Sequence, residues 1–242
     1  MINRVYFEEI QGNQVFCSSI EPVNPQKKIV IMSHGFRGSS IGPARQFVDF
    51  QELLIKEGYS VLRFDQPHGG NSGGDFIDSS FKEWVATIVY FTNKYLSLGY
   101  QVSLLGQSMG ATATVVATND PAIKNMVPCI LLWVPDAKTT IEINPDEIYE
   151  ESAQKYRGNF WDEAKHSNFF TCLQEYKGGI HLVYGEFDRY VHKDLKRQTV
   201  EIVKSKQQQV MILKGQDHSP WEYDLVQTVY QEEISLLKKY LL

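Results

Sequence analysis

The pentapeptide Gly106-Gln107-Ser108-Met109-Gly110 decides the fold of this chain. It has the form G-x-S-x-G, which places a serine on a tight turn between a strand and a helix. Residues 101–105 (QVSLL) before it predict a short buried strand, and residues 111–117 (ATATVVA) after it predict a helix packed on a sheet. Because the chain reverses within about two residues, we expect a strained backbone at Ser108 and small residues around it.

Such a turn places the Ser108 hydroxyl at the carboxyl end of the sheet, beside the N-terminus of the following helix. Free backbone N–H groups and the positive end of the helix dipole favour a developing negative charge there. G-x-S-x-G also occurs by chance in glycine-rich turns. The interpretation therefore depends on the flanking strand and helix, and on whether the chain supplies a base, an acid and a second N–H donor.

The composition is typical of a globular protein and excludes several classes of function. The 242 residues are 43% hydrophobic and 22% charged, with a net charge of −5, and suffice for one large α/β domain. No long basic cluster is present, so nucleic acid is not expected as a partner. No apolar run approaches the roughly 20 residues that span a bilayer, and residues 1–9 lack the pattern of a signal peptide. We therefore expect a cytoplasmic protein without a membrane partner.

The sequence offers no pattern for a metal or a cofactor. The cysteines Cys17, Cys129 and Cys172 are an odd and sparse set, which fits a reducing compartment. Cys129 lies in an apolar run, where a thiol acts as a small hydrophobe and not as a nucleophile. Residues 65–74 are glycine-rich but lack the G-K-[ST] of a phosphate loop, and no His/Cys/carboxylate cluster has metal-ligand spacing. We therefore expect neither a metal ion nor a cofactor.

Strand and helix patterns alternate along most of the chain. Alternating polarity over residues 4–10 and 14–20 predicts a hairpin with its turn at Gly12-Asn13. Buried strands are predicted at 28–33, 59–64, 101–105, 126–134, 180–184 and 210–213, and helices at 44–57, 81–98, 193–204 and 221–241. This order predicts an α/β fold, a mostly parallel twisted sheet with helices on both faces and the hairpin at one edge. We interpret residues 1–242 as one domain.

One stretch, residues 136–178, interrupts the alternation. It is longer than a crossover between neighbouring strands needs. It is charged, yet it also contains many aromatic residues, namely Tyr149, Tyr156, Phe160, Trp161, Phe169, Phe170 and Tyr176. We interpret 136–178 as a small cap, inserted after the sixth strand and lying over the carboxyl ends of the strands. The alternative is a peripheral helical hairpin that only stabilises the sheet edge.

A serine hydroxyl becomes a strong nucleophile only when a base removes its proton and a third group orients that base. Of the six histidines, His218 is best placed, because residues 214–220 (KGQDHSP) connect the last predicted strand to the last helix. Asp188, in residues 185–191 (GEFDRYV), follows a strand at the same end of the sheet and is the candidate acid. Asp217 is the weaker alternative, because adjacent side chains rarely aim at one another.

A tetrahedral intermediate also needs two N–H donors directed at its oxyanion. The backbone N–H of Met109 is one candidate, since it belongs to the residue that follows the serine. The backbone N–H of Phe36 is the other, because residues 34–38 (HGFRG) follow an earlier predicted strand. Gly35 allows this loop to approach closely.

Together these motifs resemble the α/β-hydrolase superfamily over nearly the whole chain. The resemblance rests on residues 34–38 (HGFRG), 64–65 (FD), 106–110 (GQSMG), 185–188 (GEFD) with Val191, and 215–218 (GQDH). The chain order Ser108, Asp188, His218 matches the superfamily's order. Within it, the chain is similar to small bacterial carboxylesterases of the cinnamoyl/feruloyl esterase type, which have a like H-G-F loop, a strand ending in R-F-D and a cap after the sixth strand. The cap sequence departs from theirs, so we carry over no substrate-binding residue.

The resemblance implies a serine hydrolase that cleaves small-molecule carboxylic esters through an acyl-enzyme on Ser108. The aromatic residues of the cap favour an apolar or aromatic acyl group. Two alternatives stay open: an amide, peptide or thioester hydrolase with the same three side chains, and a non-catalytic binding protein on a hydrolase scaffold. The sequence does not indicate the oligomeric state.

Overall fold

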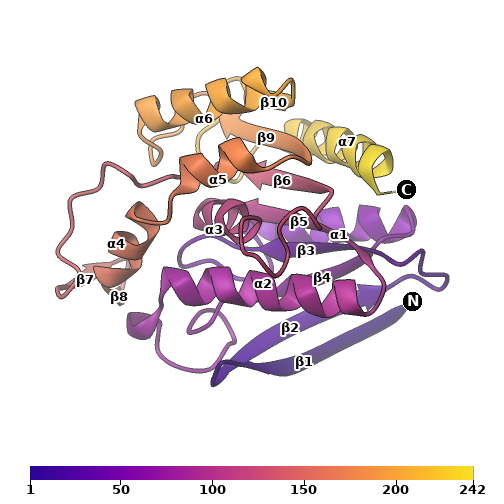
Figure 1. The fold of residues 1–242 in the computed structure, drawn as a ribbon, viewed down its shortest axis with the longest axis horizontal. Helices are drawn as coiled ribbons and strands as arrows, with labels where there is room; N and C mark the ends of the chain where they lie inside the picture. Colours follow the sequence, from indigo (N-terminus) through magenta and orange to yellow (C-terminus); the bar gives the residue numbers. More distant parts are fainter. Residues whose placement is uncertain (242) are drawn as a thin grey trace.

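The computed structural model describes residues 1–241, and its centre is one eight-stranded sheet in the order β1-β2-β4-β3-β5-β6-β9-β10 (Figure 1). β1 (Ile2–Ile10) and β2 (Asn13–Glu21) pair antiparallel, as do β2 and β4 (Ser60–Phe64). All further pairings are parallel, through β3 (Lys28–Ser33), β5 (Gln101–Gln107), β6 (Cys129–Trp133), β9 (Gly179–Gly185) and β10 (Gln209–Leu213). The predicted mostly parallel sheet with an antiparallel hairpin at one edge is confirmed.

The hairpin turn lies one residue earlier than the sequence pattern predicts. Ile10 pairs with Asn13, so the turn consists of Gln11 and Gly12, and the predicted turn at Gly12-Asn13 is wrong. Both turn residues have a positive φ, 52° for Gln11 and 85° for Gly12, as a type I′ turn requires. A glutamine in this conformation is uncommon, which explains why the pattern pointed to the next residue.

Helices cover both faces of the sheet, as predicted (Figure 1). On one face, α1 (Gln46–Lys56) packs against α7 (Tyr223–Tyr240), and the rings of Phe50 and Tyr230 stack with centroids 4.7 Å apart. On the other face lie α2 (Phe81–Ser97), α3 (Met109–Ala117), α5 (Phe169–Glu175) and α6 (Lys193–Ser205). Two short 3₁₀ turns, Pro43–Arg45 and Phe76–Asp78, precede α1 and α2. No helix in residues 1–241 is both long enough and apolar enough to cross a membrane.

The segment between β6 and β9 folds as a two-stranded hairpin followed by two short helices. The hairpin is β7 (Ile148–Glu151) with β8 (Gln154–Arg157), and α4 (Asn159–Lys165) comes before α5. Four of its aromatic residues, Phe160, Trp161, Phe169 and Tyr176, are buried, and the Phe160 ring lies 4.9 Å from that of Trp84 in α2. Phe36, in the loop after β3, packs against Tyr156, Phe160 and Trp161 at 4.5–5.1 Å. The hairpin and α4 therefore lie beside the loop that follows β3.

A carboxyl group lies in the apolar interior between α7 and the sheet. Glu233 is fully buried, and its Oε1 accepts a hydrogen bond from Trp133 Nε1 at 2.6 Å and lies 3.2 Å from His181 Nδ1. Its Oε2 has no hydrogen-bond partner in the described part of the chain. Burial raises the pKa of Glu233 above 4.5, because the charged form loses its hydration, although both partners favour that form. The folded protein therefore holds this proton more tightly than the unfolded chain does.

Replacing Glu233 separates the two roles of this carboxyl. Glu233→Ala leaves the buried Trp133 N–H without an acceptor and should lower the free energy of unfolding by about 2–4 kcal/mol. Glu233→Gln keeps an acceptor and should change it by less than about 1 kcal/mol near neutral pH. Because a raised folded-state pKa makes stability decline as the pH rises above 4.5, this decline should be smaller in the Gln variant. Urea unfolding of the three proteins from pH 4.5 to neutrality measures both effects, and equal losses in the two variants would contradict them.

Candidate active site

The loops after several parallel strands meet at one edge of the sheet. Ser108 directly follows β5, Asp188 follows β9, and His218 lies in the loop between β10 and α7. Since β5, β9 and β10 run in parallel, their carboxyl ends lie on the same side of the molecule. The three residues predicted from the sequence therefore share one rim.

Ser108 has the strained backbone that the sequence predicts. Its φ of 54° and ψ of −123° lie outside the regions that non-glycine residues favour. The Ser108 N–H donates to the carbonyl of Trp133 at 2.8 Å, which fixes the turn to β6. A Cβ on Gly106 would overlap the backbone of Ala111, and one on Gly110 would overlap the carbonyl oxygens of Ser33 and His34. The two glycines thus permit the close contact of α3 with β5 and β3.

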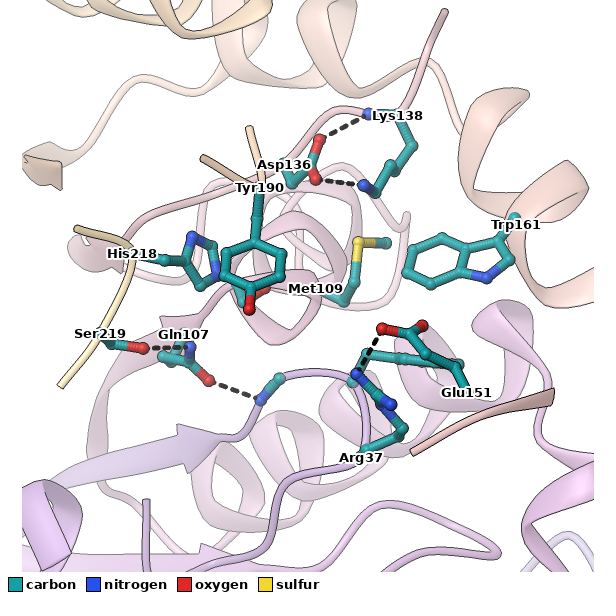
Figure 2. Close-up of a pocket in the computed structure, with 13 residues that line it drawn as sticks. Arg37, Gln107, Met109, Asp136, Lys138, Glu151, Trp161, Tyr190, His218 and Ser219 are labelled. Carbon is teal, nitrogen blue, oxygen red and sulfur yellow. Dashed lines mark hydrogen bonds and ion pairs between the residues drawn. The ribbon is translucent and has the colours of Figure 1, made fainter. Parts of the chain in front are cut away.

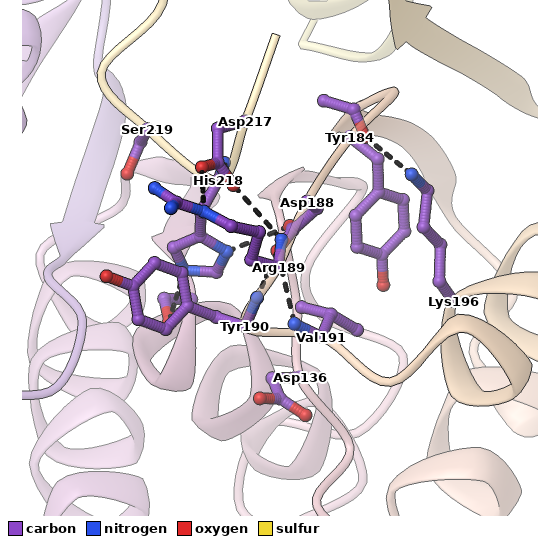
Figure 3. A network of polar contacts seen from close by, with 12 residues as sticks. Asp136, Tyr184, Asp188, Arg189, Tyr190, Val191, Lys196, Asp217, His218 and Ser219 are labelled. Carbon is purple, nitrogen blue, oxygen red and sulfur yellow. Dashed lines mark hydrogen bonds and ion pairs between the residues drawn. The ribbon is translucent and has the colours of Figure 1, made fainter.

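The side chains of Ser108, His218 and Asp188 form a continuous chain of hydrogen bonds (Figure 3). His218 Nε2 lies 3.0 Å from Ser108 Oγ, and His218 Nδ1 lies 2.8 Å from Asp188 Oδ2. The Asp188 side chain is fully buried, and its Oδ1 also accepts from the backbone N–H groups of Tyr190 and Val191 at 3.0 and 3.1 Å. With the Nδ1 proton donated to Asp188, Nε2 is free to accept from the Ser108 hydroxyl.

Asp217 faces away from the His218 ring. Its carboxylate accepts from the backbone N–H groups of Arg189 and His218, at 3.0 and 2.8 Å, and from Arg189 Nε at 2.5 Å. The N–H of Arg189 and these other donors hold the pKa of Asp217 below its usual value. Asp217 therefore joins the loop after β9 to the loop after β10, and the geometry does not support it as the imidazole's partner.

Phe36 and Met109 both line the cavity in front of Ser108. Within residues 1–241, no hydrogen bond engages the backbone N–H of either residue. The loop carrying Phe36 is held by Gln107, whose Oε1 accepts from the Gly35 N–H at 2.9 Å and whose Nε2 donates to Ser219 Oγ at 3.2 Å (Figure 2). A Cβ on Gly35 would stand 2.5 Å from Gln107 Oε1, so only glycine allows this approach.

His34 supports the same loop and is not directed at Ser108. Its Nε2 accepts from the backbone N–H of Gln66 at 2.8 Å, and its Nδ1 lies 2.8 Å from the carbonyl of Gly35. This pattern requires a neutral ring protonated at Nδ1, and burial lowers the pKa of His34 in agreement with it. The loops after β3 and β4 are therefore joined through an uncharged imidazole.

The cavity in front of Ser108 has a volume of about 270 Å³. Two ion pairs lie in its wall: Asp136 with Lys138 at 2.6 Å, and Arg37 with Glu151 at 2.9 Å (Figure 2). Lys138 Nζ lies 5.1 Å from the centre of the Trp161 ring. None of these four charged residues could be predicted as part of the site, because each pair depends on the conformation of a loop in the insertion.

Tyr190 is a further residue that the sequence analysis missed. Its ring lies 5.3 Å from the ring of His218 and covers one side of the cavity (Figure 2). It is two residues beyond Asp188, and that spacing is the only sequence signal that could have found it.

The three cysteines are held in the interior of the protein as neutral thiols. All three cysteines are buried, and burial raises the pKa of Cys17 and Cys129 to about 12, so both remain thiols. Among the described residues, no group of three or more His, Cys, Asp or Glu side chains is arranged to hold a metal ion.

The arrangement of strands and loops matches solved structures over almost the entire chain. Est1E from Butyrivibrio proteoclasticus, in a structure with ferulic acid bound, superposes with a TM-score of 0.81 and 19% identity, over 96% of this chain and 99% of that one. Alpha/beta hydrolase domain-containing protein 10 from mouse superposes with a TM-score of 0.79 and 17% identity, over 98% and 99%. The chain has the α/β-hydrolase fold.

One lipase and one lipase homolog are also similar to this chain. Monoacylglycerol lipase from Paleococcus ferrophilus superposes with a TM-score of 0.72 and 16% identity, over 92% of this chain and 99% of that one. In sequence, a monoglyceride lipase homolog of Monkeypox virus is 28% identical over 129 residues, which are 52% of this chain. The match spans 45% of that viral protein, so this chain aligns with less than half of it. No family model matches the chain.

Gly110 offers a test of the contact between α3 and β3. In Gly110→Ala, the new methyl group must push α3 away from the carbonyls of Ser33 and His34, and we expect a loss of about 1–3 kcal/mol in unfolding free energy. Gly69→Ala is the matched control, because the nearest atom to its new Cβ is 3.5 Å away. Thermal unfolding should show a Tm several degrees lower for Gly110→Ala alone. Equal Tm values for the two variants would contradict the tight contact.

Proposed function

We propose that this protein is a serine hydrolase that cleaves carboxylic esters. The main support is the hydrogen-bonded series Asp188–His218–Ser108, which has the distances that nucleophilic catalysis by a serine needs. The strained turn that presents Ser108 at the N-terminus of α3 agrees with this role. The names of the similar proteins favour esters over amides or thioesters, since one is a lipase, one is a lipase homolog and one structure holds ferulic acid.

In the proposed reaction, Ser108 Oγ attacks the acyl carbon while His218 Nε2 takes the hydroxyl proton. The carbonyl oxygen becomes an oxyanion and accepts hydrogen bonds from the backbone N–H groups of Phe36 and Met109. His218 then gives its proton to the departing alcohol oxygen, and the acyl group stays on Ser108. A water molecule repeats the sequence with His218 as the base, which releases the acid and restores the Ser108 hydroxyl.

Asp188 and the N–H donors supply the electrostatic part of this mechanism. The Asp188 carboxylate fixes the imidazole with its Nδ1 proton inward and stabilises the imidazolium when it forms. Each oxyanion donor is worth about 3 kcal/mol of the barrier when it is held in place before the reaction. Gln107 holds the Phe36 donor through Gly35, so we assign it a positioning role.

We further propose that residues 136–178 act as a cap over this cavity within a single domain of residues 1–242. Arg37 in the loop after β3 and Glu151 at the end of β7 form an ion pair across the cavity wall. Trp161 from α4 lines the same wall. The volume of about 270 Å³ is slightly below that of pockets for drug-sized ligands, which favours a small ester. The rings of Phe36, Trp161 and Tyr190 in the lining favour an apolar or aromatic acyl group.

Removing the Ser108 hydroxyl tests the proposed chemistry. Ser108→Ala should lower kcat/KM for p-nitrophenyl esters at least about a thousand-fold, because no nucleophile remains beside His218. Ser235→Ala on α7 is the control and should retain full activity, because within residues 1–241 the Ser235 hydroxyl bonds only the Gln231 carbonyl of its own helix. Circular dichroism of both variants checks the fold.

A fluorophosphonate probe and a substrate panel separate the remaining alternatives. The probe should label the native protein at Ser108 and leave Ser108→Ala unlabelled. Turnover of acyl-CoA or aminoacyl anilides above that of esters of graded acyl length, including hydroxycinnamates, would replace the ester assignment by a thioester or amide one. A native, folded protein that neither reacts with the probe nor hydrolyses any of these substrates would be a binding protein.

The ion pair between Arg37 and Glu151 tests the cap. Glu151→Gln removes one charge of the pair and should raise KM for esters by up to about threefold with little change in kcat, since partly exposed ion pairs contribute less than about 1 kcal/mol. Glu150→Gln is the matched control, because Glu150 is exposed on the same strand and makes no ion pair within residues 1–241. Identical KM values for both variants would show that the pair does not hold the cap over the substrate.

A further inference from the structure

The strand β1 ends the sheet with an open edge. It pairs with β2 on one side only, over all nine of its residues. Natural proteins usually protect such an edge with proline, charged side chains, a bulge or a covering segment; residues 2–10 (INRVYFEEI) contain neither proline nor lysine, and their charged residues are Arg4, Glu8 and Glu9. Val5 and Phe7, in the middle of the strand, are 63% and 52% exposed. The edge is thus long, regular and partly apolar.

The hydrogen bonds of β2 determine which backbone groups of β1 are free. The N–H of Phe16 donates to Ser72 Oγ, and its carbonyl accepts from the Asp65 N–H, so both groups point away from β1. Phe7 lies opposite Phe16. In an antiparallel ladder, two opposite residues either both direct their N–H and C=O groups at each other or both direct them away from each other. The backbone groups of Asn3, Val5, Phe7 and Glu9 therefore point outward, away from β2.

The charges of β1 are divided between its two halves. Arg4 lies near its start, while Glu8 and Glu9 lie near its end. No ion pair in residues 1–241 involves Arg4, whereas Glu8 Oε2 lies 2.7 Å from Lys94 Nζ of the same chain. Because the backbone groups of odd-numbered residues point outward, an antiparallel copy of β1 can pair only odd with odd and even with even residues. Among these registers, the one centred on Tyr6 places Arg4 opposite Glu8 of the second copy, and Val5 opposite Phe7.

We propose that a second copy of this chain pairs through β1, so that two sheets join into one continuous antiparallel sheet with a two-fold axis at Tyr6. Each favourable cross-strand pair then occurs twice, as a two-fold interface requires. Val5 and Phe7 of both copies form one apolar cluster on the outer face. On the other face, a groove of about 630 Å³ beside Arg4 and Tyr6, with Lys94 in its wall, lies where the acidic half of the partner strand arrives.

The proposed register makes the strand complementary to itself and not to an arbitrary chain. The two nearest allowed registers have their two-fold axis at Val5 or at Phe7. In these, Val5 faces Val5 or Phe7 faces Phe7, and Arg4 no longer faces Glu8. Parallel pairing in register places like charges together. The other open edge, β10, has only five residues. Charge and side-chain pattern thus select one geometry at one edge.

A charge-reversal experiment tests the proposal on the intact protein. Sedimentation equilibrium should show that the native chain dimerises reversibly below concentrations on the order of 100 µM. Arg4→Glu and Glu8→Arg each place like charges opposite one another twice, and each alone should raise the dimer dissociation constant at least about tenfold. An equimolar mixture of the two variants should recover dimers, because every such pair then has opposite charges. Circular dichroism confirms that each variant is folded.

Disulfide crosslinking between introduced cysteines tests the register of the two strands. Tyr6→Cys places two thiols opposite each other at a non-hydrogen-bonded site, where the Cα atoms are close enough for a disulfide, so mild oxidation should give a covalent dimer. Phe7→Cys is the control: the two thiols lie diagonally, about 7–8 Å apart, and should crosslink much less. The native cysteines are buried and should not contribute.

Three results would overturn the proposal. One is a native protein that stays monomeric throughout this concentration range. Another is a dimer that both charge variants retain, which would place the interface elsewhere, for example at β10. A third is crosslinking of Phe7→Cys that exceeds that of Tyr6→Cys, which would exclude this register.

Discussion

The contact of Gly110 with the carbonyl oxygens of Ser33 and His34 is the constraint on which the rest of the site depends. It brings the first turn of α3 against the end of β3, and so fixes the loop that carries Gly35 and Phe36 in front of Ser108. Gln107 also holds this loop, because its side-chain oxygen accepts a hydrogen bond from the Gly35 N–H. The N-terminus of α3, the strained Ser108 and the backbone N–H of Phe36 thus converge because one residue lacks a side chain.

Asp188 and Asp217 have different hydrogen-bond partners because different loops hold them. Asp188 is enclosed by the backbone of its own turn and directs one oxygen at His218. Asp217 is adjacent to His218 in sequence, yet its oxygens accept hydrogen bonds from Arg189 and from the backbone N–H of His218. Proximity along the chain therefore gives no contact with the ring, whereas a residue thirty positions away supplies it.

Much of this arrangement could be predicted from the sequence, because strand ends are visible in it. Ser108, Asp188 and His218 each follow a predicted strand, and parallel strands bring their carboxyl ends together. The parts that escaped prediction depend on loop conformation. Glu151 meets Arg37 only because an irregular insertion folds back, and no periodic pattern marks that path. The predicted hairpin turn differs from the observed one by one residue, because Gln11 adopts a conformation that glutamine rarely takes.

Trp133 joins the interior carboxyl to the serine turn through its two polar groups. Its indole N–H donates to Glu233, and its carbonyl accepts the N–H of Ser108. One residue thus spans the distance from the middle of the protein to Ser108. Helix α7, which does not line the cavity, is thus connected to the Ser108 turn through the two hydrogen bonds of this one residue.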